Sequence, residues 1–356
     1  MATILYSLAG EGRGHAARAR AMIDALGGEH RFVVLTSGDA FRFLEPLYRT
    51  NENVEVRRIP GVRFQYADGR MNLPRSIGAG LVFKHRIPRF TARVREIVRR
   101  AAPALAVVDF EPLLPRVARE LGVPVVSLDH QHFLVTYDLS SLPLSLRRWA
   151  WGMRLAVALY RIRPEKIIVS AFFRPPLKKG WEGAIQVGPL LRREVHQYHP
   201  TKEGYLLSYL RHTSPPAVLE GLKRVDREVR VYGLGARPSD TNLVFKPIHE
   251  RTFLEDLSGC AGVVAATGNQ LIGESLFFGK PFFGIPERLH HEQRINAYFL
   301  QQMGCGDWRF LEDVGREDFV GFSETLHTYA EGLGETRGRI DATQTAAEEI
   351  RRMISR

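Results

Sequence analysis

The stretch Gly268–Pro281 reads GNQLIGESLFFGKP, and it decides the fold class of this chain. It combines a glycine turn, a helix start, a carboxylate at Glu274 and a Gly-Lys-Pro stop. The apolar run 262–265 precedes it and the apolar run 282–285 follows it. A helix between two short apolar strands is typical of a parallel α/β sheet. The stretch therefore predicts a strand–helix–strand unit with a turn at the carboxyl end of its first strand.

The start of this helix also predicts an anion site. Helix N-termini carry N–H groups without intrahelical partners and a partial positive charge, so they hold phosphate oxygens well. The donor groups at this start are the Thr267 hydroxyl, the Gly268 N–H and the amides of Asn269 and Gln270. Glu274 follows closely enough to accept hydrogen bonds from a ribose. These groups could instead simply cap the helix, and Glu274 could instead face solvent. A phosphate site next to a ribose site nevertheless favours a sugar nucleotide as the ligand.

The same alternation of strands and helices runs along the whole chain and predicts two domains. Apolar runs at 3–8, 31–36, 54–59, 105–108, 123–128, 167–169 and 184–187 form a first set, and runs at 204–210, 229–232, 243–245, 262–265 and 282–285 form a second. We expect Rossmann-like α/β domains at 1–190 and 201–356, joined by the linker Gly188–Pro200, with the last helix able to pack on either. Facing domains of this kind bind substrates in the cleft between them.

Composition narrows the class of protein. The chain has 356 residues, 44% hydrophobic and 25% charged, which is typical of a globular protein with an ample core. It has two cysteines, so we expect a reducing cytoplasmic location and no zinc site. The apolar N-terminus predicts a buried strand rather than a targeting segment. The net charge of +11 favours an anionic partner: nucleic acid, an acidic lipid surface or a phosphorylated substrate.

The first strand runs into a glycine loop, residues 9–15, that reads AGEGRGH. Alternate glycines let the backbone turn sharply and approach a ligand. His15 stands where the dinucleotide fingerprint needs its last glycine, and no Walker lysine is present, so a nicotinamide enzyme and a P-loop ATPase are both disfavoured. Gly12, Arg13 and Gly14 are candidates for acceptor binding.

Three side chains in the first domain are candidate general bases. His15 lies at a helix start, where the helix dipole disfavours the imidazolium and leaves a neutral ring able to accept a proton. Asp109 and Glu111 follow the strand 105–108, and each could instead cap a helix. Asp129 and His130 end the next strand along the chain and are candidates for the acceptor side.

The second domain adds candidates around the donor. Gly235 lies in a turn after a strand, and Phe245 could stack on a base or simply end its strand. His291, Glu292 and Gln293 crowd the first turn of a helix, where the hydroxyls of a transferred sugar need partners. Adjacent residues point apart and lack the H-E-x-x-H spacing, so we expect no metal.

These motifs together resemble the GT-B glycosyltransferases. The similarity is to the family 28-like group that contains the peptidoglycan N-acetylglucosaminyltransferase, and still more to its prokaryotic relatives, which open with a strand, a G-x-G-x-G-H loop and an Arg-Ala-rich helix. It runs in order along nearly the whole chain. The segments that carry it are Gly10–Ala21, Gly268–Pro281, His291–Ala297 and Met303–Gly306.

The resemblance implies metal-independent transfer of a hexosyl or N-acetylhexosaminyl group from a nucleoside-diphosphate sugar, commonly a UDP-sugar, with inversion. It implies no cofactor beyond that co-substrate. It places His15 near the acceptor, Glu274 at the ribose and Gln293 by the donor sugar. One departure matters: Glu11 and Arg13 stand between the glycines, where the peptidoglycan enzyme has a Gly-Gly-Thr-Gly-Gly-His type of loop. That difference puts the lipid-diphosphate acceptor of that enzyme in doubt.

A basic, aromatic segment bears on the acceptor. Residues 146–163 carry two tryptophans and arginines at seven-residue spacing, namely Arg147, Arg154 and Arg161, and a second stripe comprises Arg86, Arg89, Arg93 and Arg100. Such helices can lie on anionic lipid at the inner face of the cytoplasmic membrane, which suits a lipid or cell-envelope acceptor, or can simply pack on their own sheet.

The rival functions are a nucleotide-sugar epimerase or hydrolase on this fold and a nucleic-acid-binding protein. We expect no nucleic acid, because the aromatic-basic pattern of the known modules is missing.

Overall fold

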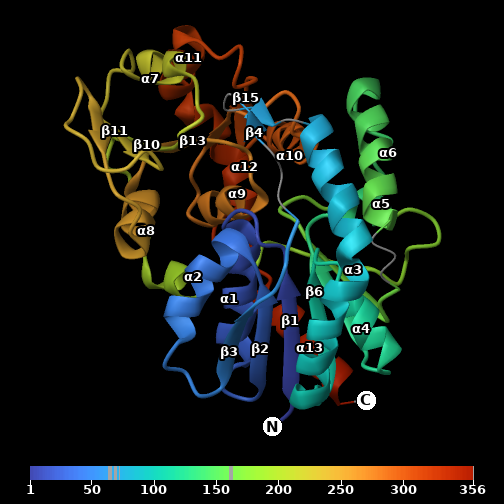
Figure 1. Cartoon of the computed structure of the whole chain (residues 1–356). Coiled ribbons are helices and arrows are strands. Elements are labelled where there is room, and N and C mark those ends of the chain that lie inside the picture. The colour runs from blue at the N-terminus through green and yellow to red at the C-terminus, as the bar shows by residue number, and fades with distance from the viewer. Residues whose placement is uncertain (63–65, 68–69, 72, 160–162, 356) are drawn as a thin grey trace. The chain divides into compact units, whose positions relative to one another are not determined.

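The computed structural model describes residues 1–62, 66–67, 70–71, 73–159 and 163–355 of the chain. These residues form two compact units (Figure 1). Unit 1 comprises Met1–Ala67, Met71–Arg192 and Ala342–Arg356, and unit 2 comprises Asp68–Arg70 and Arg193–Asp341. The unit boundary after Arg192 falls inside the expected linker, and the last helix belongs to unit 1.

Unit 1 is built on a seven-stranded parallel sheet with the order β3-β2-β1-β6-β7-β8-β9. The strands are β1 Thr3–Leu8, β2 Arg31–Thr36, β3 Val54–Arg58, β6 Leu105–Asp109, β7 Val125–Asp129, β8 Lys166–Ser170 and β9 Ile185–Val187. The chain order reverses between β1 and β6, where Leu8 is level with Asp109. In open α/β sheets such a reversal marks the place where ligands bind.

Alternate residues of β1 point to opposite faces of this sheet and so build two cores. Ile4, Tyr6 and Leu8 face one core, which also contains α1 (Gly14–Leu26) and α13 (Thr343–Ile354). Leu5 faces the other core, which α3 (Leu73–Ala101) and α4 (Leu114–Glu120) complete. The remaining helices of unit 1 are α2 Gly38–Tyr48, α5 Phe133–Thr136 and α6 Leu144–Leu159.

Unit 2 contains a six-stranded parallel sheet with the order β12-β11-β10-β13-β14-β15. Its strands are β10 Leu206–Tyr209, β11 Val229–Tyr232, β12 Leu243–Phe245, β13 Gly262–Ala265, β14 Phe282–Gly284 and β15 Gly306–Trp308. Its helices are α7 Pro216–Leu222, α8 Glu250–Gly259, α9 Asn269–Phe277, α10 His291–Gln302, α11 Arg316–Glu324 and α12 Ala330–Thr336, with short 3-10 turns at Arg193–Gln197 and Leu326–Tyr329. The expected strand–helix–strand unit is β13–α9–β14.

Two Rossmann-like parallel sheets confirm the predicted fold class, but several elements differ from the sequence interpretation. The segment 60–84 has no clear sequence motif, yet α3 already begins at Leu73, and the short strands β4 (Tyr66–Ala67) and β5 (Arg70–Met71) pair before it. Helix α2 contains Pro46, which disrupts the usual helical pattern, and β15 is too short to stand out. No helix in the described part of the chain is long and apolar enough to span a membrane. Arg161 of the expected arginine stripe lies outside the described residues.

Candidate functional site

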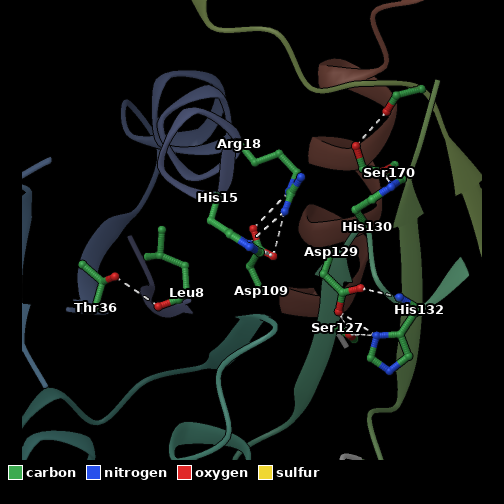
Figure 2. A network of polar contacts seen from close by, with 11 residues as sticks. Leu8, His15, Arg18, Thr36, Asp109, Ser127, Asp129, His130, His132 and Ser170 are labelled. Carbon is green, nitrogen blue, oxygen red and sulfur yellow. Dashed lines mark hydrogen bonds and ion pairs between the residues drawn. The ribbon is translucent and has the colours of Figure 1, made fainter. Parts of the chain in front are cut away.

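The ionisable side chains of His15, Arg18 and Asp109 meet at the switch point of unit 1 (Figure 2). Asp109 is the last residue of β6, and helix α1 begins beside it after the glycine loop. The Nδ1 atom of His15 lies 2.8 Å from Oδ1 of Asp109. Arg18, one helical turn after His15, donates from Nε to Oδ2 and from Nη2 to Oδ1 of Asp109, both at 3.0 Å. The result is a His–Asp pair whose carboxylate is also held by a bidentate arginine.

Burial and charge determine the ionisation of this cluster. Asp109 and Arg18 are both buried. Burial raises the pKa of Asp109, but Arg18 and His15 outweigh it, and the pKa lies below the ordinary value. Burial lowers the pKa of Arg18, yet Asp109 raises it more. Asp109 is therefore a carboxylate and Arg18 a guanidinium, and the buried pair is close to neutral in charge.

The hydrogen bonds indicate the tautomer of His15. Nη2 of Arg18 is also 3.0 Å from Nδ1 of His15. An arginine only donates and a carboxylate only accepts, so Nδ1 can serve one of these partners but not both. We assign the proton to Nδ1, which then donates to Asp109 across the shorter distance and leaves the lone pair on Nε2. That atom has no hydrogen-bond partner among the described residues, and the side chain is 14% exposed.

Glu111 is occupied by the backbone of α4. Its two carboxylate oxygens accept the N–H groups of Leu113 at 2.8 Å and Leu114 at 2.9 Å. The side chain is buried, and this burial raises its pKa to about 7 although the backbone N–H groups oppose the rise. Glu111 thus takes the capping role that the sequence left open.

The next strand end carries a second His–Asp pair. Asp129 accepts the Ser127 hydroxyl at 2.7 Å, and it lies 2.6 Å from Nδ1 of His132 (Figure 2). Burial raises the pKa of Asp129, but His132 and these hydrogen bonds lower it to about 2. His130 is 3.0 Å from the Ser170 carbonyl oxygen and packs against Phe133. Asp129 and His130 are therefore buried at the carboxyl end of β7.

The glycine loop shapes the entry to α1. Gly12 has φ +77°, a conformation that favours glycine. Arg13 is exposed, precedes α1 as its N-cap residue and lies 5.7 Å from the centre of the Phe43 ring. Gly14 is the first helical residue. Arg18, in contrast, is buried. Its spacing of three residues after His15 on one helix face was the available signal.

In unit 2, the turn before α9 is tied to α10. The Thr267 hydroxyl donates to the Gln293 carbonyl at 2.6 Å, and Asn296 donates to the Thr267 carbonyl at 2.9 Å. The Gly268 N–H donates to the Ala266 carbonyl at 2.8 Å. In this structure both groups shape the turn, and the expectation that they bind a ligand stays a prediction.

The remaining polar groups of α9 lie on its first two turns. Helix α9 begins at Asn269, so the positive end of its dipole lies at the carboxyl edge of the sheet. Gln270 donates from Nε2 to Oε1 of Glu274 at 3.2 Å. Asn269, Gln270 and Glu274 are all buried.

The start of α10 is similarly ordered. Gln293 is buried, and its side-chain oxygen accepts the Glu287 N–H at 3.0 Å. This bond does not use the side-chain NH₂ group of Gln293. His290 is the N-cap residue and accepts the Gln293 N–H. Burial, with Arg294 nearby, lowers the pKa of His291 to about 4, so that ring is neutral. Glu292 lies half-buried in the first turn.

The turn after β11 and the end of β12 lie at the carboxyl edge of the same sheet, on the other side of β10 from β13 and α9. Gly233 has φ +92°, and a Cβ atom there would lie 1.9 Å from the Leu210 carbonyl oxygen, so only glycine fits. Gly235 has φ +80°. Phe245 ends β12, with the Arg237 guanidinium 5.6 Å from its ring centre. Among the described residues, no group of three or more His, Cys, Asp or Glu side chains is arranged to hold a metal ion.

Comparisons with known proteins show the family of the chain through a sequence profile and its fold through solved structures. The profile of a family described as "Glycosyl transferase family 1" matches residues 2–326. No curated protein sequence matches the chain. Among solved structures, an Arabidopsis thaliana protein, UGT89C1 complexed with UDP-L-rhamnose, has a TM-score of 0.71 at 11% identity and 98% coverage of each chain. LpCGTa in complex with UDP has a TM-score of 0.70 at 16% identity and 100% coverage of each chain.

A third solved structure is MurG from Acinetobacter baumannii, with a TM-score of 0.63 at 14% identity. The alignment covers 99% of this chain and 100% of that one. At these identities the structures show a shared GT-B fold, which is the fold that the sequence motifs predicted.

Proposed function

Because the chain belongs to glycosyl transferase family 1, we propose that it moves a hexosyl or N-acetylhexosaminyl group from a UDP-sugar to an acceptor hydroxyl. The transfer inverts the anomeric centre and uses no metal. The observation that carries this proposal is the 2.8 Å contact between His15 and the buried carboxylate of Asp109. It holds the imidazole of His15 at the carboxyl edge of a parallel sheet, with Nε2 free of hydrogen bonds to the described residues.

His15 is the general base in this mechanism. Its Nε2 lone pair takes the proton of the acceptor hydroxyl as the oxygen attacks the anomeric carbon. Asp109 orients the ring and stabilises the imidazolium as it forms, the part that a carboxylate plays in a catalytic triad. Arg18 fixes the carboxylate. We propose that Gly12, Arg13 and Gly14 contact the acceptor. Asp129 and His130 belong to the buried layer of side chains behind the acceptor site.

The donor belongs to unit 2. The first turn of α9, with Asn269 and Gln270, stabilises the charge that develops on the leaving diphosphate. Glu274 accepts the ribose hydroxyls, and Glu292, Gln293 and the neutral His291 meet the sugar. Phe245 and Gly235 frame the base. One bond forms between the acceptor oxygen and the anomeric carbon, the bond from that carbon to the phosphate oxygen breaks, the proton goes to His15, and UDP leaves.

A panel of nucleoside diphosphates tests the donor site. At a hundred times its dissociation constant, a ligand adds about 2.7 kcal/mol to the free energy of unfolding, which is visible as a rise in Tm. We expect UDP to raise the Tm of the wild type. Glu274→Ala should weaken binding by about ten- to hundredfold, because it removes a charged hydrogen-bond acceptor.

The matched control is Glu317→Ala in α11, where the carboxylate is 88% exposed. It should keep the full shift. A wild type that responds to no nucleoside diphosphate would contradict the donor assignment. Steep salt-dependent binding to DNA or RNA would then favour the nucleic-acid-binding alternative.

The acceptor is proposed to be lipid-linked, because unit 1 exposes apolar and basic side chains together. Leu146, Ala150 and Val157 form the buried stripe of α6, so its packing leaves Trp149 and Trp151 outside, the latter 64% exposed. On α3, Leu81 and Val82 are exposed as well. Exposed cations accompany them, namely Lys84, Arg86, Arg89, Arg147, Arg148 and Arg154. Tryptophan with arginine suits an anionic membrane, and the chain would act at the inner face of the cytoplasmic membrane.

Vesicle sedimentation tests this surface. We expect the wild type to pellet with vesicles containing anionic lipid at low salt and to stay in the supernatant with neutral vesicles. Trp149→Ser with Trp151→Ser should abolish pelleting. Leu47→Ser, which removes an exposed leucine from α2, is the control and should pellet normally. Equal pelleting of both variants would rule out the tryptophans as the contact.

A further inference from the structure

The strand register in unit 2 brings three loops to one level. Tyr209 of β10 pairs with Ala265 of β13, and Ala265 pairs with Gly284 of β14. Arg211 follows Tyr209 by two residues, and Gly268 and Glu287 follow Ala265 and Gly284 by three, so all three come directly after the carboxyl ends of neighbouring strands. Gly268 follows β13, the middle strand of the three, and is the N-cap residue of α9.

An ion pair crosses this middle strand. The Nη1 atom of Arg211 donates to Oε1 of Glu287 at 2.8 Å. Their strands are both neighbours of β13 but not of each other, and adjacent strands lie about 4.8 Å apart, so the two side chains must reach toward each other across the end of β13. The pair therefore lies beside the turn that leads into α9.

Both residues are held in place by their surroundings. The Arg211 N–H donates to the Ser214 hydroxyl at 3.2 Å, and the Ser214 N–H donates back to the Arg211 carbonyl at 2.9 Å. The Glu287 N–H is bound by Gln293, and the Glu287 side chain is 11% exposed. Arg211 is 43% exposed, and its Nε and Nη2 atoms have no hydrogen-bond partner within the described residues. A fixed guanidinium thus keeps most of its donors available.

We propose that Arg211 binds the diphosphate of the donor nucleotide and that Glu287 is the positioning residue that directs it. This inference rests on the proposed function, because it assumes a nucleoside diphosphate at α9. An arginine presents several donors in a rigid fork, so one N–H can stay with Glu287 while the others bind phosphate oxygens. The helix dipole of α9 and the cation from the neighbouring strand would then act on the same phosphates.

The experiment compares UDP with uridine in isothermal titration calorimetry. Arg211→Gln should weaken UDP binding about ten- to hundredfold, which is the range for losing charge-assisted hydrogen bonds, and should leave uridine binding unchanged. Glu287→Gln keeps an acceptor for Nη1 but loosens the orientation, so we expect a smaller loss. Arg211→Lys keeps the charge without the fork and should fall between wild type and Arg211→Gln.

The control is Arg227→Gln. Arg227 precedes β11 at the opposite edge of the same sheet and binds Ser323, so its loss removes an equal charge away from α9. It should bind UDP as the wild type does.

The double variant Arg211→Gln with Glu287→Gln removes both charges of the pair. Its Tm without ligand should exceed that of Arg211→Gln, while its affinity for UDP should stay low. A recovery of UDP affinity together with Tm would mean that the pair is only structural.

The outcomes separate this inference from the proposed function. If the wild type binds UDP and Arg211→Gln binds it equally well, the inference is wrong and the transferase proposal stands. If Arg211→Gln weakens UDP and uridine alike, the residue acts on folding rather than on the phosphates, and the inference is again wrong. If the wild type binds no nucleoside diphosphate, both fail together.

Discussion

Replacing His15 with alanine is expected to lower kcat by about 10²–10⁴-fold, the usual contribution of a general base. The loss follows because Nδ1 of His15 contacts the buried carboxylate of Asp109 at the switch point of unit 1, while Nε2 has no hydrogen-bond partner among the described residues. UDP should still raise the Tm of this variant, since the donor groups lie in unit 2. The measurement is the initial rate of UDP release in the presence of an acceptor.

The control for this variant is His30→Ala. His30 follows α1 in the turn before β2, at the amino edge of the same sheet, and its loss should leave kcat unchanged within a factor of two or so. A His15→Ala enzyme with the wild-type rate would exclude His15 as the base. A different group would then have to take the proton of the acceptor hydroxyl.

Replacing Asp109 with asparagine should destabilise the protein by about 3–5 kcal/mol, the range for breaking a buried ion pair from one side. Arg18 is 3% exposed and donates two hydrogen bonds to this carboxylate, so the variant leaves a guanidinium buried without its counter-charge. The measurement is the free energy of unfolding from urea denaturation, followed as a shift in the midpoint.

A double-mutant cycle with Arg18→Met separates the ion pair from other effects of the substitution. The double variant buries neither charge, so it should be more stable than Asp109→Asn alone. It should also lose activity, because His15 then has no carboxylate to orient it. A loss of stability below about 0.5 kcal/mol in Asp109→Asn would show that Arg18 finds another partner or reaches solvent.

Local signals in the sequence predicted most elements of the fold. The runs at 3–8, 31–36 and 229–232 are strands with these bounds, and the start of α9 lies where the glycine turn indicated. The failures have local causes. Pro46 disrupts the pattern of α2, and the three residues of β15 carry too few apolar positions to stand out. The first turns of α3 contain glycine and proline, so a segment that is helical from Leu73 looked irregular.

The sequence by itself determined the α/β class, the two sets of strands and the candidate residues His15, Asp109, Glu111 and Glu274, because apolar periodicity and glycine turns are local properties of the chain. The tertiary structure alone decided the partners of those residues. His15 and Asp109 are 94 positions apart and meet only because β6 lies next to β1, and the same pairing buries Arg18 on Asp109. The cap role of Glu111 and the bridge from Arg211 to Glu287 depend equally on which strand ends are neighbours. Strand order is a property of the whole packed sheet, so no short stretch of sequence encodes it.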